Sequence, residues 1–282
     1  MCERLLAGLF GLALLVPAGG AGQDLRTITS MRQRADEDLL RVEVQYGAGR
    51  LEVGAGSGAT LYRANLRYDA EVFQPMMSYQ PGLLRLGLDD LKVRGRDLKS
   101  GHLRLELTRD VPLELKLEFG ATRSEIDLGG LRIRQARIAT GASETDLTVS
   151  SPNSEACRLL EMEVGAAQFR AHQLGNLNAE RVTLSGGVGE VLLDFTGEWR
   201  SNLTADIKMG LGSLTLRVPR GLGIRVRKSG LLVGFDSQGL VKRGDVYYSE
   251  DWEDADHQLT VNVDAALGSV RVAWVEPDSS DR

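Results

Sequence analysis

Apolar and polar residues alternate one by one along most of the chain. Val42, Val44 and Tyr46 are separated by charged or amide residues, and the same two-residue period returns at Leu103 and Leu105. A period of two is typical of β-strands with one buried face, because successive side chains point to opposite sides of a sheet. The pattern lacks the three- and four-residue spacing of a helix. It therefore predicts an all-β protein.

A unit that begins with glycine repeats within this alternation. It starts at Gly120, Gly141, Gly165, Gly187 and Gly210, with steps of 21, 24, 22 and 23 residues. A period in the twenties is typical of stacked repeats, in which one coil cannot bury its apolar face alone. We therefore expect a parallel β-solenoid with coils of about 22 residues, each made of roughly three short strands. The alternative is an antiparallel β-sandwich in which the glycines form hairpin turns.

The recurring glycines are the expected corners of these coils. Glycine suits a corner because it has no Cβ and tolerates a tight turn or a positive φ. The predicted corner residues are Gly47, Gly120, Gly141, Gly165, Gly187, Gly210 and Gly268.

The chain begins with a segment that is typical of an export signal. Residues 5–16 are mostly apolar, and mainly small residues follow up to residue 22. The apolar run is shorter than the roughly 20 residues that span a membrane. We therefore interpret residues 1–22 as a signal peptide and expect no stable membrane insertion after its cleavage. This predicts an exported protein of the periplasm or the cell surface.

Two short segments flank the predicted strands, one at each end of the chain. Residues 23–39 have scattered apolar positions and are expected to form a leader or a short helix. Residues 276–282 are a polar tail. The open edge of a terminal coil must be covered, and we expect Trp274 and this tail to cover it.

Charge and cysteine content narrow the classes of protein further. The net charge is −5, and a mildly acidic surface disfavours nucleic acid as a partner. Cys157 is the one cysteine outside the predicted signal, so no internal disulfide is expected. A lone cysteine beside Arg158-Leu-Leu160 is most often a buried packing residue.

Candidate catalytic and metal-binding residues are few and scattered. His102, His172 and His257 are far apart, without a second histidine or a cysteine nearby, whereas a zinc site needs about four such ligands. Carboxylates such as Glu144 and Asp146 alternate along a strand and would stack into outward rows. Paired carboxylates can cleave glycosidic bonds, but a solvated strand face is the simpler interpretation. We therefore expect no enzyme activity, no metal and no cofactor.

One acidic loop with aromatic residues lies near the C-terminus. Its candidate residues are Tyr247, Tyr248, Asp251, Trp252 and Asp254. Carboxylates can bind Ca²⁺, but this spacing is not that of an EF-hand and the required glycine is missing. The loop is therefore either solvated or a partner-docking loop with its aromatic residues as anchors.

Residues 40–200 contain Val42-x-Val44 before Gly47-Ala-Gly49, then Gly175-Asn-Leu-Asn-Ala179 and Leu193-Asp-Phe-x-Gly-Glu-Trp199. With these features the segment resembles the toast-rack domain. The resemblance implies a single-stranded right-handed β-helix. It supplies no catalytic residues.

Residues 201–275 contain Gly210-Leu-Gly-x-Leu-x-Leu-x-Val-Pro219 and Leu267-Gly-Ser-Val-x-Val272. With these motifs the segment is similar to the C-terminal domain of LiaF-like proteins of the cell-wall-active-antibiotic response. This region is expected to continue the same stack of coils. The resemblance implies, by analogy, a role in envelope stress or surface organisation.

The repeats, the predicted signal and the missing catalytic set favour a non-enzymatic exported β-solenoid. We expect it to act as a structural or binding module in the bacterial cell envelope. Its partner would be an unknown envelope protein or a second copy of the chain. One alternative is an envelope-stress sensor or regulator that acts through a membrane partner. A third hypothesis is a carbohydrate-active β-helix.

Overall fold

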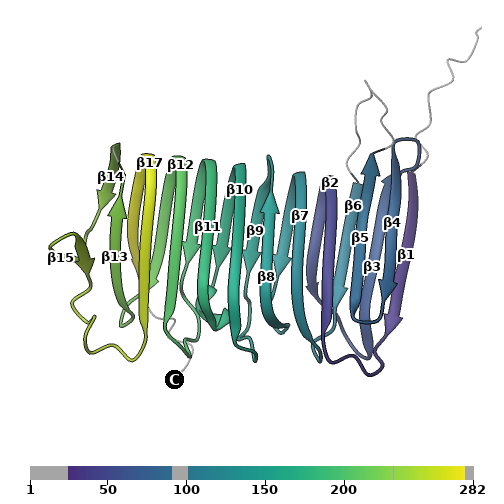
Figure 1. Cartoon of the computed structure of the whole chain (residues 1–282), viewed down its shortest axis with the longest axis horizontal. Helices are drawn as coiled ribbons and strands as arrows, with labels where there is room; N and C mark the ends of the chain where they lie inside the picture. The colour runs from purple at the N-terminus through teal and green to yellow at the C-terminus, as the bar shows by residue number, and fades with distance from the viewer. Residues whose placement is uncertain (1–24, 91–100, 231, 277–282) are drawn as a thin grey trace, which may run out of the picture.

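The computed structural model describes residues 25–90, 101–230 and 232–276 (Figure 1). The predicted signal peptide and the polar tail beyond Glu276 lie outside the described residues. The described chain consists of β-strands and one short 3-10 helix, η1 (Leu174–Leu177), which confirms the expected all-β class. The strands are β1 (Leu25–Gln33), β2 (Leu40–Ala55), β3 (Thr60–Asp69), β4 (Phe73–Gln80), β5 (Leu83–Asp90), β6 (Gly101–Leu107), β7 (Pro112–Asp127), β8 (Arg132–Thr140), β9 (Glu144–Thr148), β10 (Cys157–His172), β11 (Ala179–Asp194), β12 (Leu203–Pro219), β13 (Gly223–Ser229), β14 (Leu232–Asp236), β15 (Val241–Arg243), β16 (Val246–Tyr248) and β17 (Gln258–Val275).

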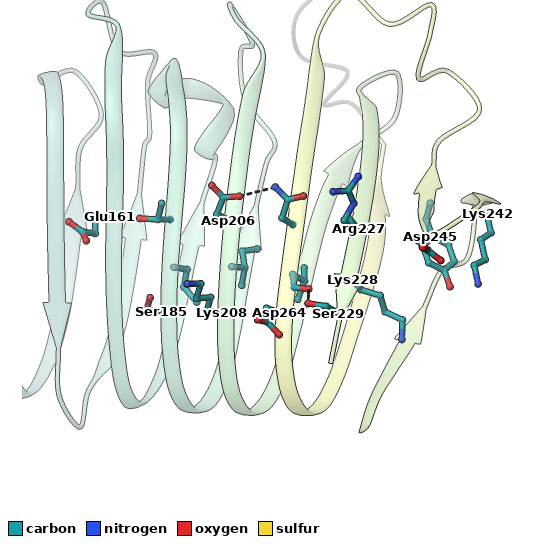
Figure 2. Close-up of a pocket in the computed structure, with 16 residues that line it drawn as sticks. Glu161, Ser185, Asp206, Lys208, Arg227, Lys228, Ser229, Lys242, Asp245 and Asp264 are labelled. Carbon is teal, nitrogen blue, oxygen red and sulfur yellow. Dashed lines mark hydrogen bonds between the residues drawn. The ribbon is translucent and has the colours of Figure 1, made fainter. Parts of the chain in front are cut away.

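Six long strands, β2, β7, β10, β11, β12 and β17, bend in the middle. They have 16 to 18 residues each, and Figure 2 shows neighbouring strands curving back on themselves at one edge. We call the first halves, together with β8 and β13, layer A, and the second halves, together with β9 and β14, layer B. Each coil therefore has two strand segments instead of the three that we expected.

The burial pattern explains how one strand serves both layers. In β12 the buried residues are odd-numbered from Leu203 to Met209 and even-numbered from Leu214 to Val218. The other five long strands switch parity in the same way. A straight strand would keep one parity on one face. Because the parity changes at the bend, the buried side chains of the first half and of the second half both point into the single core between layers A and B.

Successive coils in the middle of the chain pair in parallel, one repeat apart. Leu160 is the register partner of Val182, and Val182 is the partner of Ala205. All three side chains are fully buried, so inward residues stack on inward residues from coil to coil. The antiparallel sandwich that we considered as the alternative does not describe this part of the chain.

The two ends of the stack depart from this parallel pattern. At one end β3 pairs antiparallel with β1 and β6, and β4 pairs antiparallel with β5. At the other end β16 pairs antiparallel with β13 and β15. The sheet is therefore mixed, and the expected single-stranded parallel β-helix does not describe its ends. Within the predicted leader or short helix, Leu25–Gln33 is strand β1 instead, because its backbone pairs with β3.

The last strand of the chain does not end the stack (Figure 1). β17 pairs with β12 on one side and with β13 and β14 on the other, all in parallel. The chain thus leaves the stack after β12, forms β13–β16, and returns to fill the place beside β12. The expectation that Trp274 covers the terminal coil is wrong, because Trp274 lies on this interior strand. The end of layer A is formed instead by β15, whose three residues are too few to template much pairing with other chains.

Glycine is required at the bends because consecutive coils approach closely there. A Cβ on Gly120 would lie 2.4 Å from the carbonyl oxygen of Gly47, and a Cβ on Gly212 would lie 1.9 Å from that of Gly189. Gly212 also has a φ of 140°, which side chains with a Cβ rarely adopt. Any larger residue at Gly212 would therefore clash and strain the backbone at once.

The predicted corner glycines belong to two rows. In the first row, each member from the second onward faces the carbonyl oxygen of the member before it; the row is Gly47, Gly120, Gly141, Gly165, Gly187 and Gly210. Gly268 is the register partner of Gly212 and shares its positive φ, so it belongs to the second row. The positive φ of a Gly-x-Gly pair belongs to its second glycine, at Gly49 and Gly189 for example.

Buried asparagines join the coils on the side opposite the glycine bends. Asn153 is fully buried, and its Nδ2 donates to the carbonyl oxygens of Ile133 and Leu177 at 2.8 and 3.0 Å. Its Oδ1 accepts hydrogen bonds from the amides of Ile133 and Glu155. These bonds satisfy backbone groups of three coils where the strand ladder is interrupted. The sequence analysis did not identify this role.

We predict that Gly212→Ala lowers the free energy of unfolding by about 2–4 kcal/mol, through the clash with Gly189 and the positive φ. The matched control is Gly47→Ala, because a Cβ there would meet no atom within 4 Å. Urea unfolding followed by circular dichroism measures both. Equal midpoints for the two variants would contradict the role given to close backbone approach.

We predict that Asn153→Ala costs about 2–4 kcal/mol of stability, since it leaves several buried backbone groups without a partner. Asn65→Ala is the control, because the Asn65 side chain accepts one bond from Thr29 at an exposed position. Thermal unfolding of both variants provides the comparison. A loss at Asn153 no larger than at Asn65 would show that water replaces the lost bonds.

Candidate ligand-binding groove

Two rows of polar side chains cross the outward face of layer A. The first row runs in register through Glu161, Thr183, Asp206, Asn262 and Arg227. These positions alternate with the buried residues of β10, β11, β12, β17 and β13, so the strand pleat places their side chains outward. With neighbouring strands about 4.8 Å apart, the row spans roughly 19 Å. Figure 2 labels Glu161, Asp206 and Arg227 of this row.

The second row lies beside the first, two residues closer to the bends. It consists of Ser185, Lys208, Asp264 and Ser229. All four side chains are exposed. The two rows together present hydroxyl, carboxylate, amide, ammonium and guanidinium groups on one surface.

Some polar side chains of the two rows already have hydrogen-bond or ion-pair partners within the protein, and others do not. Asp206 is fully engaged, because its Oδ1 accepts from Asn262 Nδ2 at 2.8 Å and its Oδ2 is paired with Arg181. Within the described part of the chain, the charged groups of Lys208, Arg227 and Asp264 have no hydrogen bond or ion pair. The centre of the surface is thus ordered internally, while charges around it are free to contact a ligand.

A hairpin forms a wall at one end of these rows. β16 pairs with β13 through Arg227 and Val246, and β15 pairs with β16 through Lys242 and Tyr247. The Tyr247 ring packs edge-on against Phe235 with centroids 4.7 Å apart. Together, the rows and the wall enclose a groove of about 950 Å³, which Lys228 and Asp245 also line (Figure 2).

The predicted docking loop contributes only one residue to this groove, Tyr247. Tyr248 and Trp252 pack edge-on against each other at 5.8 Å, and Arg225 lies over the Trp252 ring at 5.4 Å. These aromatic side chains are partly buried within the protein itself.

The two carboxylates of the predicted docking loop lie apart from the groove. Asp251 and Asp254 are exposed, and the backbone of Asp251 accepts hydrogen bonds within the loop. Asp251 lines a separate hollow beside Trp274. The docking role of this loop as a whole stays a prediction.

The predicted carboxylate rows lie outward on layer B, where arginines alternate with them. Glu144 Oε2 accepts from Arg123 at 2.7 Å, and Asp146 Oδ1 accepts from Arg170 at 3.2 Å. The hydrogen bond from Arg123 is the main cause that lowers the pKa of Glu144. A carboxylate held ionised in this way is a poor general acid. The rows are therefore ion-paired surfaces in this structure.

The described residues contain no group of three His, Cys, Asp or Glu side chains arranged to hold a metal ion. His102 Nε2 lies 3.2 Å from Glu52, and His172 lies between Asp146 and Asp194 at 4.0 and 3.9 Å. Across these same residues, the chain has no helix with the length and apolar character needed for a transmembrane segment.

An exposed aliphatic row marks the outer side of the bends. Val188, Leu211 and Leu267 are in register on β11, β12 and β17 and are 54%, 46% and 48% exposed. Each occupies the position before a positive-φ glycine, Gly189, Gly212 or Gly268. At this point of the bend the side chain points away from the core.

The groove was missed by the sequence analysis because its residues look like ordinary outward strand positions. A signal does exist in their spacing. Glu161, Thr183 and Asp206 each stand four residues before a repeat glycine, and Asn262 stands four residues before Ala266. Aligning the repeats on these positions would have revealed the row, but not the hairpin wall beside it.

We predict that Cys157 of the folded protein reacts with a thiol reagent at least about a hundredfold more slowly than that of the unfolded chain. Its side chain is fully buried, and this burial raises its pKa to about 12. Because the thiolate is the reactive form, raising the pH from 7 to 9 should leave the folded rate low. Rapid labelling without urea would contradict this.

Comparison with known proteins identifies a family for most of the chain. The family model described as the N-terminal domain of toast_rack, DUF2154, matches residues 21–170 and 153–217. The match confirms the toast-rack resemblance. The LiaF-like resemblance of residues 201–275 stays a prediction. No curated protein matches the chain.

Several solved structures are similar over most of the chain at low identity. A protein from Clostridium sporogenes, provisionally named a cell adhesion protein, is 13% identical with a TM-score of 0.45, over 89% of this chain and 100% of its own. A provisionally named adhesin from Bacteroides fragilis is 13% identical with a TM-score of 0.42, over 88% and 97%. A provisionally named lipid-binding protein from Parabacteroides distasonis is 10% identical with a TM-score of 0.37, over 89% and 98%. These scores support no functional conclusion for this chain.

Proposed function

This chain belongs to the toast-rack family, and we propose that it serves as an exported, non-enzymatic binding module of the bacterial cell envelope. The groove on layer A is the proposed docking site. The proposed partner is a component of the cell envelope that binds to the protein and is not changed chemically by it. The alternative regulatory role, through a membrane partner, would use the same groove and is distinguished by the identity of what binds there.

One observation supports this proposal above the others: charged groups without a partner gather in the groove, whereas rows of charges on layer B are ion-paired. On layer B, Arg50 pairs with Glu125 at 2.9 Å and Arg123 pairs with Glu144 at 2.7 Å. In the groove Lys208 and Asp264 are register neighbours, yet no hydrogen bond or ion pair joins them among the described residues. Unpaired groups gathered in a concave surface are typical of a binding site.

Binding is proposed instead of catalysis because the candidate reactive groups are already occupied. Arginines hold Glu144 and Asp146, the carboxylates considered for a carbohydrate-active enzyme. The thiol of Cys157 is fully buried. Neither set lines the groove.

The finer architecture belongs to the same proposal. We expect the parallel coils to wind right-handed, and the LiaF-like residues 201–275 to continue the toast-rack stack as one rigid body. A rigid stack would suit recognition, because rows held by strand pairing lose little conformational freedom when a partner binds. The predicted signal peptide would deliver this body to the periplasm or the cell surface.

Site-specific photo-crosslinking in native cells tests the proposal. The crosslinking residue replaces Ser185, which lies in the groove, or Glu190, which is exposed on the same strand beyond the bend. We expect one reproducible adduct from position 185 and at least about fivefold less from position 190, since only the first faces the site. An excess of uncrosslinked protein should compete with the adduct.

The two positions act as each other's control for folding and export, because both lie on β11. Equal adducts from both positions would reject the groove as the docking site. Failure of position 185 to give a competed adduct in the native host would reject the binding role itself.

A further inference from the structure

The chemistry of the groove narrows the class of ligand that it can hold. Every side chain of the two rows is polar, from Glu161 to Arg227 and from Ser185 to Ser229. These outward side chains give an acyl chain little hydrophobic gain, although Leu184, Ile207 and Val263 also line the groove. The apolar residues of the same strands, such as Ile207 and Val263, are buried in the core. The two rows therefore favour a polar ligand over a lipid tail.

The backbone of the groove is not available for a peptide strand. β11, β12 and β17 are each paired with a strand on both sides. Adding a strand to a sheet requires an open edge with free N–H and C=O groups. Recognition in the groove therefore depends on side chains alone.

The balance of charges in the groove disfavours nucleic acid. The cationic residues that line it are Lys208, Arg227, Lys228 and Lys242, and the anionic residues are Glu161, Asp206, Asp245 and Asp264. These charges balance in number, in a chain whose net charge is −5. Nucleic acid binding relies on an excess of cations along a groove, which is missing here.

Alternating donors and acceptors suit a ligand rich in hydroxyl groups. Arg227 and Lys208 donate, while Asp264 and the Asn262 Oδ1 accept, and the Asn262 amide is held in orientation by its bond to Asp206. A hydroxyl group both donates and accepts, so a sugar can meet either kind of partner. Tyr247 at the wall adds a flat ring, of the kind that packs against apolar faces.

The shape of the groove points to a chain instead of a single sugar. The groove lies along a row that crosses five strands at a spacing of about 4.8 Å, so a linear ligand would meet an equivalent position at every strand. This spacing is close to the advance per residue of an extended glycan. A pocket for a small molecule would instead surround most of its ligand.

We propose that the ligand of this groove is an extended polysaccharide chain that carries amide or carboxylate groups, lying across β10, β11, β12, β17 and β13. Carboxylates of the chain would face Lys208 and Arg227, and amide or hydroxyl hydrogens would face Asp264 and Asn262. This inference rests on the proposed binding function and adds the class of ligand. The protein binds the glycan and does not cleave it.

Binding of the full exported chain to defined glycans tests the inference. The probes are N-acetylglucosamine hexasaccharide, polygalacturonate and, as an uncharged glycan without amides, dextran. Titration calorimetry measures the hexasaccharide, and mobility in native gels that contain the polymer measures the other two. We expect saturable binding to at least one of the first two probes and weaker binding to dextran.

Variants of the groove connect that binding to the site. Arg227→Gln is expected to weaken binding about tenfold and Asn262→Ala about fivefold, as for loss of one charged and one neutral hydrogen-bonding group. The matched control is Arg63→Gln on β3, because Arg63 is also exposed and lies near the opposite end of the stack. It should bind within about twofold of the unchanged protein. Equal urea midpoints show that all variants are folded.

The outcomes separate this inference from the function on which it rests. Glycan binding that survives both groove variants would overturn the assignment of the groove. If none of the three glycans binds while position 185 still gives a competed adduct in cells, the glycan inference is wrong and the binding module stands. Failure of both experiments would reject both proposals.

Discussion

The close approach of backbone to backbone at the bends is the constraint on which this structure depends. Gly189, Gly212 and Gly268 lie in register, and a Cβ on the second or third would come within 2 Å of the carbonyl oxygen of the one before. Strand spacing is fixed by hydrogen bonds at about 4.8 Å, so the bend cannot widen to admit a side chain. The sharp bend, in turn, allows the parity switch that closes layers A and B over one core.

Because of the same constraint, each coil has one side where the chain must turn tightly, at the glycine bends, and one side where the connections can vary in length. At most of the glycine bends one strand continues through the turn without a loop. The middle residue of each Gly-x-Gly pair is forced outward. On the opposite side the connections vary, and buried amides such as Asn153 supply the hydrogen bonds that the ladder cannot. Insertions are thus tolerable only on the asparagine side, where backbone groups have side-chain partners.

The strands and the core were predictable because they depend on short-range alternation. Leu203 to Met209 and Leu214 to Val218 follow a period of two on either side of Gly210, and both segments are buried as expected. The period of the glycines predicted the parallel stacking in the middle of the chain. It could not show that positive φ belongs to the second glycine of each pair, because the period is carried by the first glycine, and Thr122, Ser143 and Ala167 stand at the second position in three repeats.

The order of strands at the ends could not be derived from the period. Pairing of β17 with both β12 and β13 joins segments far apart in the sequence, and nothing in the local pattern of either segment records that contact. For the same reason the local pattern of residues 25–33 does not predict strand β1. Its exposed side chains lack a buried stripe, and its structure comes from pairing with β3.

The groove arises where the repeat pattern fails. Because β17 returns to the stack beside β12, β13 is displaced to the end of layer A, where it brings Arg227 into the row started by Glu161. The displaced segment then continues through β16 and β15 and supplies Tyr247 and Lys242 as the wall. A regular solenoid would have a flat polar face without such a wall. The segment β13–β16, which covers the end of layer A, therefore also makes the outward face of that layer concave.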